Sequence, residues 1–348
     1  MAGAGKHEVW NGNSASLGAE GGQMLATVRD RYGDADVLHQ ARIERPLVKD
    51  NEVLVRVHAA GLDRGTWHLM TGRPYVMRLF LGLRRPRNPV SGLDLAGTVA
   101  AVGRSVTRFK VGEEVFGFGN GSFAEYATAR EDKLALKPAG LTFEEAAVVP
   151  VSAVTALQGL RDAGRVQAGQ KVLVTGASGG VGSYAVQLAK AFGADVTGVS
   201  STSKMDLVRS LGADYVIDYS REDFAAGSRH YDLILDFAGN PALSRLRRAL
   251  TATGTAVVGG GEHGGNVTGM GRQLRALALS PFVSQRLAMF AARQRAVDLE
   301  EIAGLIDAGK VTPCLDRTFP LEQAEEAMRY LVAGKARGKV AITVWAPQ

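Results

Sequence analysis

The chain has 348 residues, enough for one large domain or two smaller ones. Lysine and arginine exceed aspartate and glutamate by six (41 against 35), a surplus too small to choose among a nucleic acid, a membrane surface and a phosphate-bearing small molecule. The single cysteine, Cys314, excludes an intrachain disulfide and a zinc site built on several thiolates, and it favours a reducing, cytoplasmic location. The apolar run 146–160 is shorter than a membrane-spanning helix and contains Pro150, so no span is expected.

The first third of the chain predicts an extension followed by a β-rich domain. Residues 1–23 carry six glycines and few large apolar side chains, and are set aside as a flexible extension. From Met24 onward, short alternating runs are bounded by Gly, Pro or Asp, a pattern typical of half-buried strands. These runs are LATV, VLVRVHAAG, GLDLAGTVAAVG and EEVFGF, and they predict a domain over residues 24–147.

A different pattern begins after Pro138, where Thr142 is expected to start a helix that Pro150 kinks. Strands and helices then alternate, which predicts parallel strands with crossover helices on both faces. The expected strands are 172–176, 195–201, 215–219, 231–239 and 255–261, with helices at 181–192, 205–211 and 243–250 between them. Residues 148–295 are therefore predicted to form a doubly wound α/β domain.

The final part of the chain, residues 296–348, is predicted to return to the first domain. Two helical patterns lie between Leu299 and Leu331, separated by a connector, VTPCLDRTFP, and the chain closes with the apolar strand VAITVW (340–345).

A glycine turn carries the main chemical signal. In VLVTGASGGVG (172–182) a buried strand leads directly into the turn and then into a helix, with Gly179 and Gly182 at two of the three glycine positions of a dinucleotide-binding motif and Ala177 at the first. Gly179 would let backbone amides approach a pyrophosphate, and Gly182 would let the helix pack close to the strand. The alternative is a βα turn that binds nothing.

The next strand ends in VSSTSK (199–204), where a site for NADH would place a carboxylate. Ser201, Thr202 and Lys204 instead offer hydroxyl groups and a cation, which suit the 2′-phosphate of NADPH. A solvated polar loop is the alternative interpretation. The segment predicts NADPH (NADP) as the cofactor.

In these motifs and their order, the chain resembles a medium-chain dehydrogenase/reductase of the zinc-free quinone oxidoreductase branch related to zeta-crystallin. The resemblance runs from Met24 to Val344. It implies α/β architecture with a GroES-like β-rich catalytic domain split around a Rossmann domain, and substrate in the cleft between them. The segments that carry it are VLVRVHAAGLD, GLDLAGTVAAVG, VGEEVFGFG, GSFAEYA, VPVSAVTALQGL, KVLVTGASGGVGSYAVQLAK, LGADYVIDY and KARGKVAITV.

The resemblance also implies roles for individual residues. Tyr219 would lie against the adenosine, Thr155 would face the nicotinamide, and Asn240 would border the ribose or nicotinamide. Arg337 or Lys339 would reach the phosphates. The implied cofactor-binding set is Ser178, Gly179, Gly180, Val181, Ser201, Lys204, Tyr219, Asn240, Arg337 and Lys339.

No metal is expected, because zinc-dependent relatives need a Cys and a His where this chain has other residues, with Gly92-Leu93-Asp94 replacing a GHE segment. Hydride transfer without a metal favours a quinone or an enone, whose product anion is delocalised. The candidate catalytic residues are Tyr75, Asp63 and Thr155; Asp63 stands where quinone oxidoreductases usually have Asn, and Tyr75 could donate a proton.

Two alternative functions remain open at this point: an NADP-dependent alcohol dehydrogenase or carbonyl reductase, and a non-catalytic NADPH-binding redox sensor. No nucleic-acid-binding motif is present. Residues 78–89 combine apolar and arginine side chains, which suit either a mouth loop or a peripheral membrane contact. TAVVGGG (255–261) and the following SPFVSQRLAMF predict a pairing edge for a homodimer.

Overall fold

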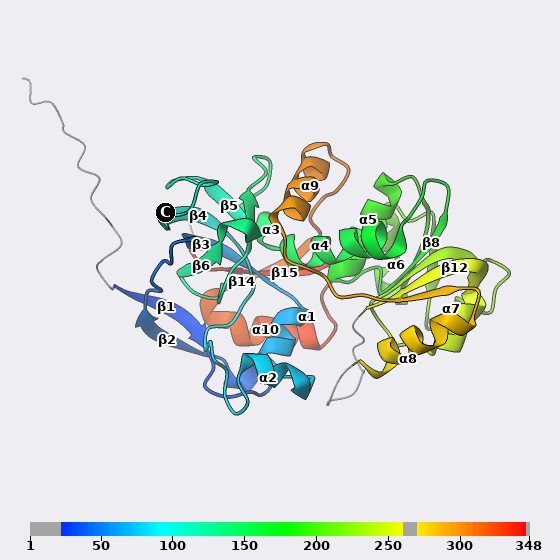
Figure 1. Ribbon diagram of the computed structural model, residues 1–348, viewed down its shortest axis with the longest axis horizontal. Helices are drawn as coiled ribbons and strands as arrows, with labels where there is room; N and C mark the ends of the chain where they lie inside the picture. Colours follow the sequence, from blue (N-terminus) through cyan, green and yellow to red (C-terminus); the bar gives the residue numbers. More distant parts are fainter. Residues whose placement is uncertain (1–21, 260–269, 346–348) are drawn as a thin grey trace, which may run out of the picture.

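The computed structural model describes residues 22–259 and 270–345, in two lobes that lie side by side (Figure 1). Apart from its last two residues, the predicted extension 1–23 lies outside the described residues, as do 260 and 261 of the expected strand 255–261. None of the helices in the described ranges is both long and apolar enough to cross a bilayer.

The first lobe is built on a seven-stranded sheet in which the order β14-β15-β3-β4-β5-β7 runs along one path and β6 pairs with β3. The predicted alternation is present in β3, where Val53 and Val55 are fully buried and Leu54 and Arg56 are partly exposed. A separate two-stranded sheet joins β1 (Gln23–Val28) to β2 (His39–Glu44). The strands of the large sheet are β3 (Glu52–Leu62), β4 (Asp94–Val102), β5 (Glu114–Phe118), β6 (Tyr126–Arg130), β7 (Leu134–Leu136), β14 (Leu315–Pro320) and β15 (Lys339–Thr343).

The second lobe contains a six-stranded parallel sheet with the order β10-β9-β8-β11-β12-β13, the arrangement of a Rossmann domain. The strand order reverses between β8 and β11: the chain adds β9 and β10 on one side of β8, and β11, β12 and β13 on the other. Sheets of this kind bind ligands at that reversal point. The strands are β8 (Lys171–Thr175), β9 (Asp195–Ser200), β10 (Tyr215–Asp218), β11 (Tyr231–Asp236), β12 (Leu250–Val258) and β13 (Arg286–Met289).

Helices cover both lobes. Around the parallel sheet lie α5 (Gly180–Ala191), α6 (Met205–Ser210), α7 (Leu243–Ala249) and α8 (Gly271–Leu279). The first lobe carries α1 (Arg64–Thr71), α2 (Arg78–Leu81), α3 (Phe143–Ala147) and α10 (Ala324–Val332). α3 begins at a reciprocal capping box between Thr142 and Glu145, the start that the sequence predicts.

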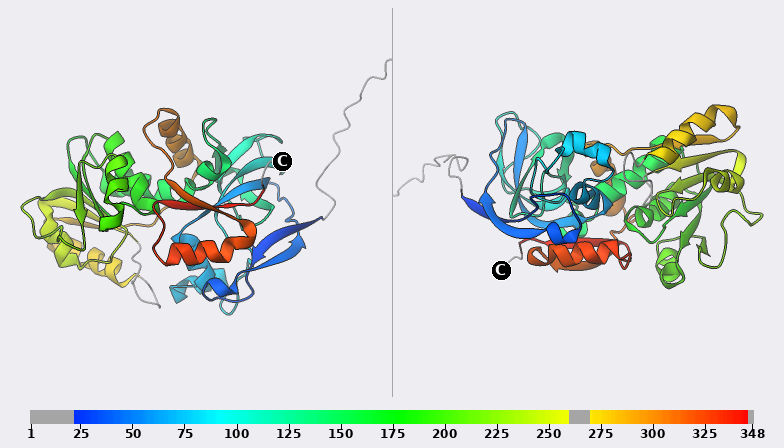
Figure 2. Two further views of the ribbon diagram at one scale, coloured as in Figure 1. Left: turned by 180° about the vertical axis from the view of Figure 1, so that it is seen from behind. Right: turned by 90° about the horizontal axis from the view of Figure 1, so that it is seen from below.

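The two lobes share one core. α4 (Pro150–Gln158) and α9 (Ala296–Asp307) lie at their junction, as the views from the front and from behind agree (Figures 1 and 2). One cluster of buried side chains runs through this junction, from Ala59 and Phe116 in the first lobe to Val172 and Leu188 in the second. The junction between the two lobes is therefore held together by continuous packing.

Part of the segment VTPCLDRTFP, which the sequence analysis treats only as a connector between two helices, is a strand, β14. β14 pairs in parallel with β15 and forms the end of the sheet path. Its Arg317 and Thr318 are exposed, so the segment lacks the apolar alternation by which a strand is predicted. β15 in turn pairs with β3, which places the last strands of the chain in the sheet of the first lobe. The domain boundaries at 147 and 295 stay predictions.

Candidate active site

The glycine turn lies between β8 and α5, at the reversal point of the parallel sheet. Gly176 has φ +63, in the left-handed region that favours glycine. A Cβ on Gly182 would overlap the carbonyl oxygen of Gly176, so the protein itself requires this glycine for close packing of strand and helix. Gly179 differs, because its φ is −89 and a Cβ there would meet only Gly176 O, at 3.2 Å. Beyond its chain neighbours, the space around this Cβ position at the start of α5 is otherwise open.

A cavity of about 300 Å³ opens beside this turn, at the carboxyl ends of β8, β9 and β11. Tyr219, which the resemblance assigns to the adenosine, lines it and is 61% exposed. Phe224 and Val199 supply further apolar surface. The full lining is Thr175, Gly176, Val199, Tyr219, Phe224, Ala238, Gly239, Pro241 and Arg245. An aromatic face, an apolar wall and an arginine can together hold a purine nucleoside.

Lys204 and Arg337 connect the predicted 2′-phosphate segment to the returning part of the chain. The Lys204 ammonium donates to Gly334 O at 2.8 Å and to Ala336 O at 2.6 Å, leaving one N–H for another partner. Arg337 donates to Ser203 O and to the Asp206 carboxylate, the latter at 2.7 Å. Burial lowers the pKa of Lys204, against the raising effect of Asp316. The structure therefore brings Lys204 and Arg337 to one short segment at the end of β9.

A buried cluster of three charged side chains lies between the lobes. The Lys339 ammonium is 3.8 Å from Oδ2 of Asp63 and 3.8 Å from Oδ2 of Asp94, and its side chain is only 1% exposed. Asp63 caps α1 by accepting from Thr66 N at Oδ1, at 2.9 Å, while its Oδ2 has no hydrogen-bond partner among the described residues; Asp94 accepts from Val151 N at 3.1 Å. Complete burial, and next the Asp63 carboxylate, raise the pKa of Asp94 well above its usual range; Lys339 opposes this shift.

The glycine turn contacts this cluster through the same C-terminal segment. Gly338 N donates to Ser178 O at 2.9 Å, and a Cβ on Gly180 would lie 3.0 Å from Cδ of Lys339 and 3.1 Å from Oγ of Ser152. Of the predicted residues, the structure thus brings Asp63, Lys339, Ser178 and Gly180 together. The ammonium of Lys339 lies between two carboxylates and has no hydrogen-bond partner among the described residues. Its predicted contact with a phosphate stays a prediction.

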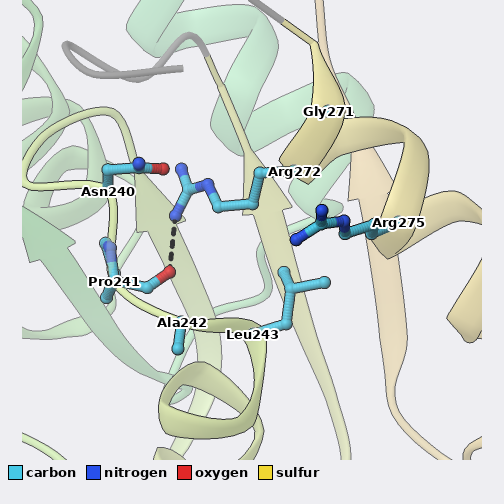
Figure 3. A pocket seen from close by; sticks show the side chains of 7 residues that line it. All are labelled: Asn240, Pro241, Ala242, Leu243, Gly271, Arg272 and Arg275. Atoms are coloured by element: carbon cyan, nitrogen blue, oxygen red, sulfur yellow. Dashed lines mark hydrogen bonds between the residues drawn. The ribbon is translucent and has the colours of Figure 1, made fainter. Parts of the chain in front are cut away.

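Asn240 lies in a second cavity, of about 450 Å³, between the ends of β11 and α8 (Figure 3). Its side chain and that of Arg272 point toward one another across this space, and Arg272 donates to Pro241 O at 3.0 Å. Arg272 also forms an ion pair with the fully buried Asp236. Burial raises the pKa of Asp236, and the charge of Arg272 opposes this shift. The Asn240 carbonyl oxygen is buried and has no hydrogen-bond partner in the described part of the chain. A ligand amide or hydroxyl could satisfy it.

The remaining predicted residues lie apart from these bonds. The Tyr75 ring is 42% exposed and packs under the Arg78 guanidinium at 4.7 Å. The Thr155 hydroxyl donates to Val151 O within its own helix at 2.6 Å. Ser201 contacts Ser203, and Val181 is half-buried near the start of α5. The catalytic roles of Tyr75, Asp63 and Thr155 stay predictions.

Sequence reasoning missed two carboxylates, Asp94 and Asp236. Each lies on a strand among apolar residues, in GLDLAG and LILDFAG, and each is fully buried. A charged residue inside an apolar strand needs a partner, so this pattern was a usable signal. The identity of the partners, Lys339 and Arg272, was not readable, since both lie far along the chain.

No cluster of three or more His, Cys, Asp or Glu side chains suited to a metal occurs within residues 22–259 and 270–345. Two histidines of the first lobe, His58 and His68, have other contacts. His58 stacks on Phe143 at 4.1 Å, and His68 meets Arg73 O at 2.7 Å.

A parallel sheet with a glycine turn at its reversal point, joined to a β-rich lobe across a charged junction, defines a nucleotide-binding oxidoreductase of two lobes. Comparisons with known proteins agree. Residues 49–139 match the alcohol dehydrogenase GroES-like domain family, and residues 211–342 match the zinc-binding dehydrogenase family. The chain belongs to the medium-chain dehydrogenase/reductase superfamily, in its quinone oxidoreductase and alkenal/one oxidoreductase branch, and is an NAD(P)H-dependent oxidoreductase.

Three similar proteins illustrate this relationship. The 2-methylene-furan-3-one reductase of Solanum lycopersicum is 34% identical over 92% of this chain and 79% of its own. The chloroplastic NADPH-dependent alkenal/one oxidoreductase of Arabidopsis thaliana is 33% identical over the same shares. The solved quinone oxidoreductase from Coxiella burnetii superposes with a TM-score of 0.82 at 28% identity, covering 93% of this chain and all of that one.

Proposed function

We propose that this protein transfers a hydride from NADPH to a quinone or an α,β-unsaturated carbonyl compound, without a metal ion. The observation that carries the proposal is the pairing of the open glycine turn at Gly179 with a buried charged cluster, Asp63, Asp94 and Lys339, at the lobe junction. The similar alkenal/one and furanone reductases support this substrate class.

The residues present fit a dinucleotide. The space beside Gly179 would admit a pyrophosphate at the N-terminus of α5, and the cavity at Tyr219 would take the adenosine. Lys204 has one N–H left for the 2′-phosphate after its two bonds to carbonyl oxygens. Asn240 would use its unpaired oxygen on the nicotinamide or ribose side. Bound NADPH would supply the hydride, which carries both electrons of the reduction.

The chain's own residues would then hold the substrate and control its charge. Hydride addition to the β-carbon of an enone gives an enolate, whose negative charge is shared by the carbonyl oxygen and the α-carbon. Hydrogen-bond donors therefore suffice, where the localised alkoxide from a simple ketone needs stronger stabilisation. Tyr75 is 42% exposed and can donate a hydrogen bond through its hydroxyl. The raised pKa of Asp94 favours a proton on this buried carboxyl beside Lys339. The proton that completes the reaction is assigned to Tyr75 or to water.

A substrate panel tests the proposal. NADPH oxidation is measured with a soluble quinone, a cyclic enone and the saturated ketone of the same ring, with the Gly179→Val variant as the control for cofactor binding. Turnover of quinone or enone at least about tenfold above the ketone is expected. Preference for the ketone would favour the carbonyl reductase alternative and contradict the assignment.

The proposal extends to assembly and location. β13 is the end of the parallel sheet as described, and its outer edge is the proposed pairing surface of a homodimer, tested by light scattering.

A cytoplasmic location rests on the single cysteine and is tested by cell fractionation.

A further inference from the structure

The charged side chains of the segment between Asp63 and Asp94 are all basic. Residues 64–93 contain no aspartate or glutamate and six arginines: Arg64, Arg73, Arg78, Arg84, Arg85 and Arg87. The middle of this segment forms a short turn, Tyr75–Met77, followed directly by α2. Neither the glycine turn nor the charged cluster of the proposed active site uses residues 79–89.

The backbone of this segment is held in place by bonds to its surroundings. Arg78 donates to Gly72 O at 3.0 Å and to Thr71 O at 3.2 Å. The Tyr32 hydroxyl donates to Gly82 O at 2.7 Å, and Arg87 N donates to Leu81 O at 2.7 Å. These bonds hold the backbone of residues 78–87 against the rest of the first lobe.

α2 and the residues that follow it present large apolar side chains to the solvent. Leu79 is 59% exposed, Phe80 76% and Leu83 67%. Three such side chains within five residues form a patch, unlike apolar residues that occur singly on a surface. Arg84, Arg85 and Arg87 follow at once, are exposed, and form no ion pair with a carboxylate of the described residues.

A basic groove of about 500 Å³ lies beside the patch. Arg29, Arg85 and Arg87 line it, with Asp30 as the single carboxylate among the described lining residues; Asp30 is 3.5 Å from His39. Arg29 is 5% exposed, donates to Ser91 Oγ at 2.9 Å, and has a buried Nε without a partner in the described part of the chain. Burial lowers the pKa of Arg29 to about 10, so it stays cationic near neutral pH.

We propose that residues 78–89 dock this protein on an anionic lipid surface, with Leu79, Phe80 and Leu83 entering the boundary between headgroups and acyl chains. Arg84, Arg85 and Arg87 then contact lipid phosphates, and the groove at Arg29 receives one of them. Apolar anchors flanked by cations are the composition that binds anionic interfaces. A nucleic acid would use the cations and leave the three apolar side chains in water.

Flotation with vesicles tests the proposal on the full chain. Vesicles of phosphatidylcholine alone are compared with vesicles that also contain phosphatidylglycerol. Binding to the mixed vesicles should exceed binding to the neutral ones by at least about tenfold and should weaken as salt is raised. The triple variants Leu79→Ser/Phe80→Ser/Leu83→Ser and Arg84→Gln/Arg85→Gln/Arg87→Gln should each lose most of this binding.

The matched control removes three equally exposed apolar side chains elsewhere in the first lobe, as Leu47→Ser/Val111→Ser/Leu136→Ser. This control should bind like the unmodified protein, and thermal midpoints show that all variants are folded. Equal binding to both kinds of vesicle, or equal losses in the control and the apolar variant, would overturn the proposal. So would a change of oligomeric state in the apolar variant without any vesicle binding by the unmodified chain, since the patch would then be a contact between copies.

Discussion

The ammonium group of Lys339 lies 3.8 Å from the carboxylate of Asp94, although 245 residues separate them in the chain. Asp94 lies at the start of β4, and Lys339 at the start of β15, directly after the segment that bonds to the glycine turn at Ser178. The pair therefore joins the β-rich lobe to the glycine turn. Removing the cation would leave two buried carboxylates next to each other.

Lys339→Met is expected to lower the free energy of unfolding by about 3–5 kcal/mol at pH 8, the usual effect of removing one member of a buried ion pair. The loss should be smaller at pH 5, where Asp94, whose pKa burial raises, can take up a proton. Urea unfolding at both pH values measures it. Lys335→Met, on the exposed part of the same segment, is the control and should change stability little. Equal losses in the two variants would show that the cluster has no stabilising role.

Asp94→Asn is expected to remove a pH dependence of stability. The pKa of Asp94 is raised in the folded protein above its unfolded value near 4, so the folded state retains a proton that the unfolded chain releases. Its contribution is fully present below about pH 4 and is lost as pH rises through the raised pKa. Unfolding free energies measured from pH 4.5 to 8 should therefore fall less steeply in Asp94→Asn. Asp307→Asn, at an exposed site, should keep the original slope.

Gly179→Val is expected to weaken NADPH binding sharply while costing little stability. The φ of −89 at this position is acceptable for valine, and the protein contact of the new Cβ is a single carbonyl oxygen at 3.2 Å. The loss should therefore come from crowding of the bound pyrophosphate. Binding and thermal midpoint are measured on one preparation. Gly182→Val is the contrasting variant, because its Cβ would overlap Gly176 O and should lower the midpoint strongly. Unchanged affinity in a folded Gly179→Val protein would remove the turn from the active site.

Lys204→Ala is expected to weaken NADPH by about 1.5–3 kcal/mol, the usual range for a hydrogen bond to a charged group, with little effect on NADH. Titration of both cofactors measures the difference. Arg209→Ala, on the exposed face of the following helix, should affect neither. If NADPH and NADH lost affinity equally, the role of Lys204 would be restricted to its bonds with Gly334 and Ala336.

Purified protein is expected to carry no stoichiometric zinc, and its activity should be indifferent to chelators. The reason is the lack of a suitable set of thiolates and imidazoles around the one cysteine. Elemental analysis before and after treatment with a chelator decides the point. One zinc per chain, lost together with activity, would contradict the metal-free mechanism.

Local patterns explain what could be predicted. The buried run at residues 172–175 and the glycines after it specify a strand, a tight turn and a helix start within a dozen residues, and all three occur as expected. Thr142 and Glu145 likewise specify a helix start through a capping box whose members are three residues apart. The strand β14 could not be predicted in this way, because its pairing with β15, and not an apolar pattern of its own, makes it a strand.

The site was predictable only in part for the same reason. Gly179 and Lys204 lie in segments with recognisable patterns, whereas Lys339 was assigned to a phosphate and lies between two carboxylates. Nothing in the residues near Lys339 indicates that Asp63 and Asp94 would enclose it, since each comes from a different element of the first lobe.

The sequence by itself determined the parallel α/β sheet, the position of the glycine turn and the exclusion of a zinc centre built on several thiolates, because each depends on short-range spacing or on composition. Only the tertiary structure decided which charges are buried together and which apolar side chains stay exposed. Lys339 and Asp94 meet because β15 returns to pair with β3, next to β4. Leu79, Phe80 and Leu83 remain exposed to solvent because the bonds of Arg78 and Tyr32 hold the backbone of this segment in place. Burial and long-range pairing depend on how distant segments pack, and this information is absent from any local stretch of the chain.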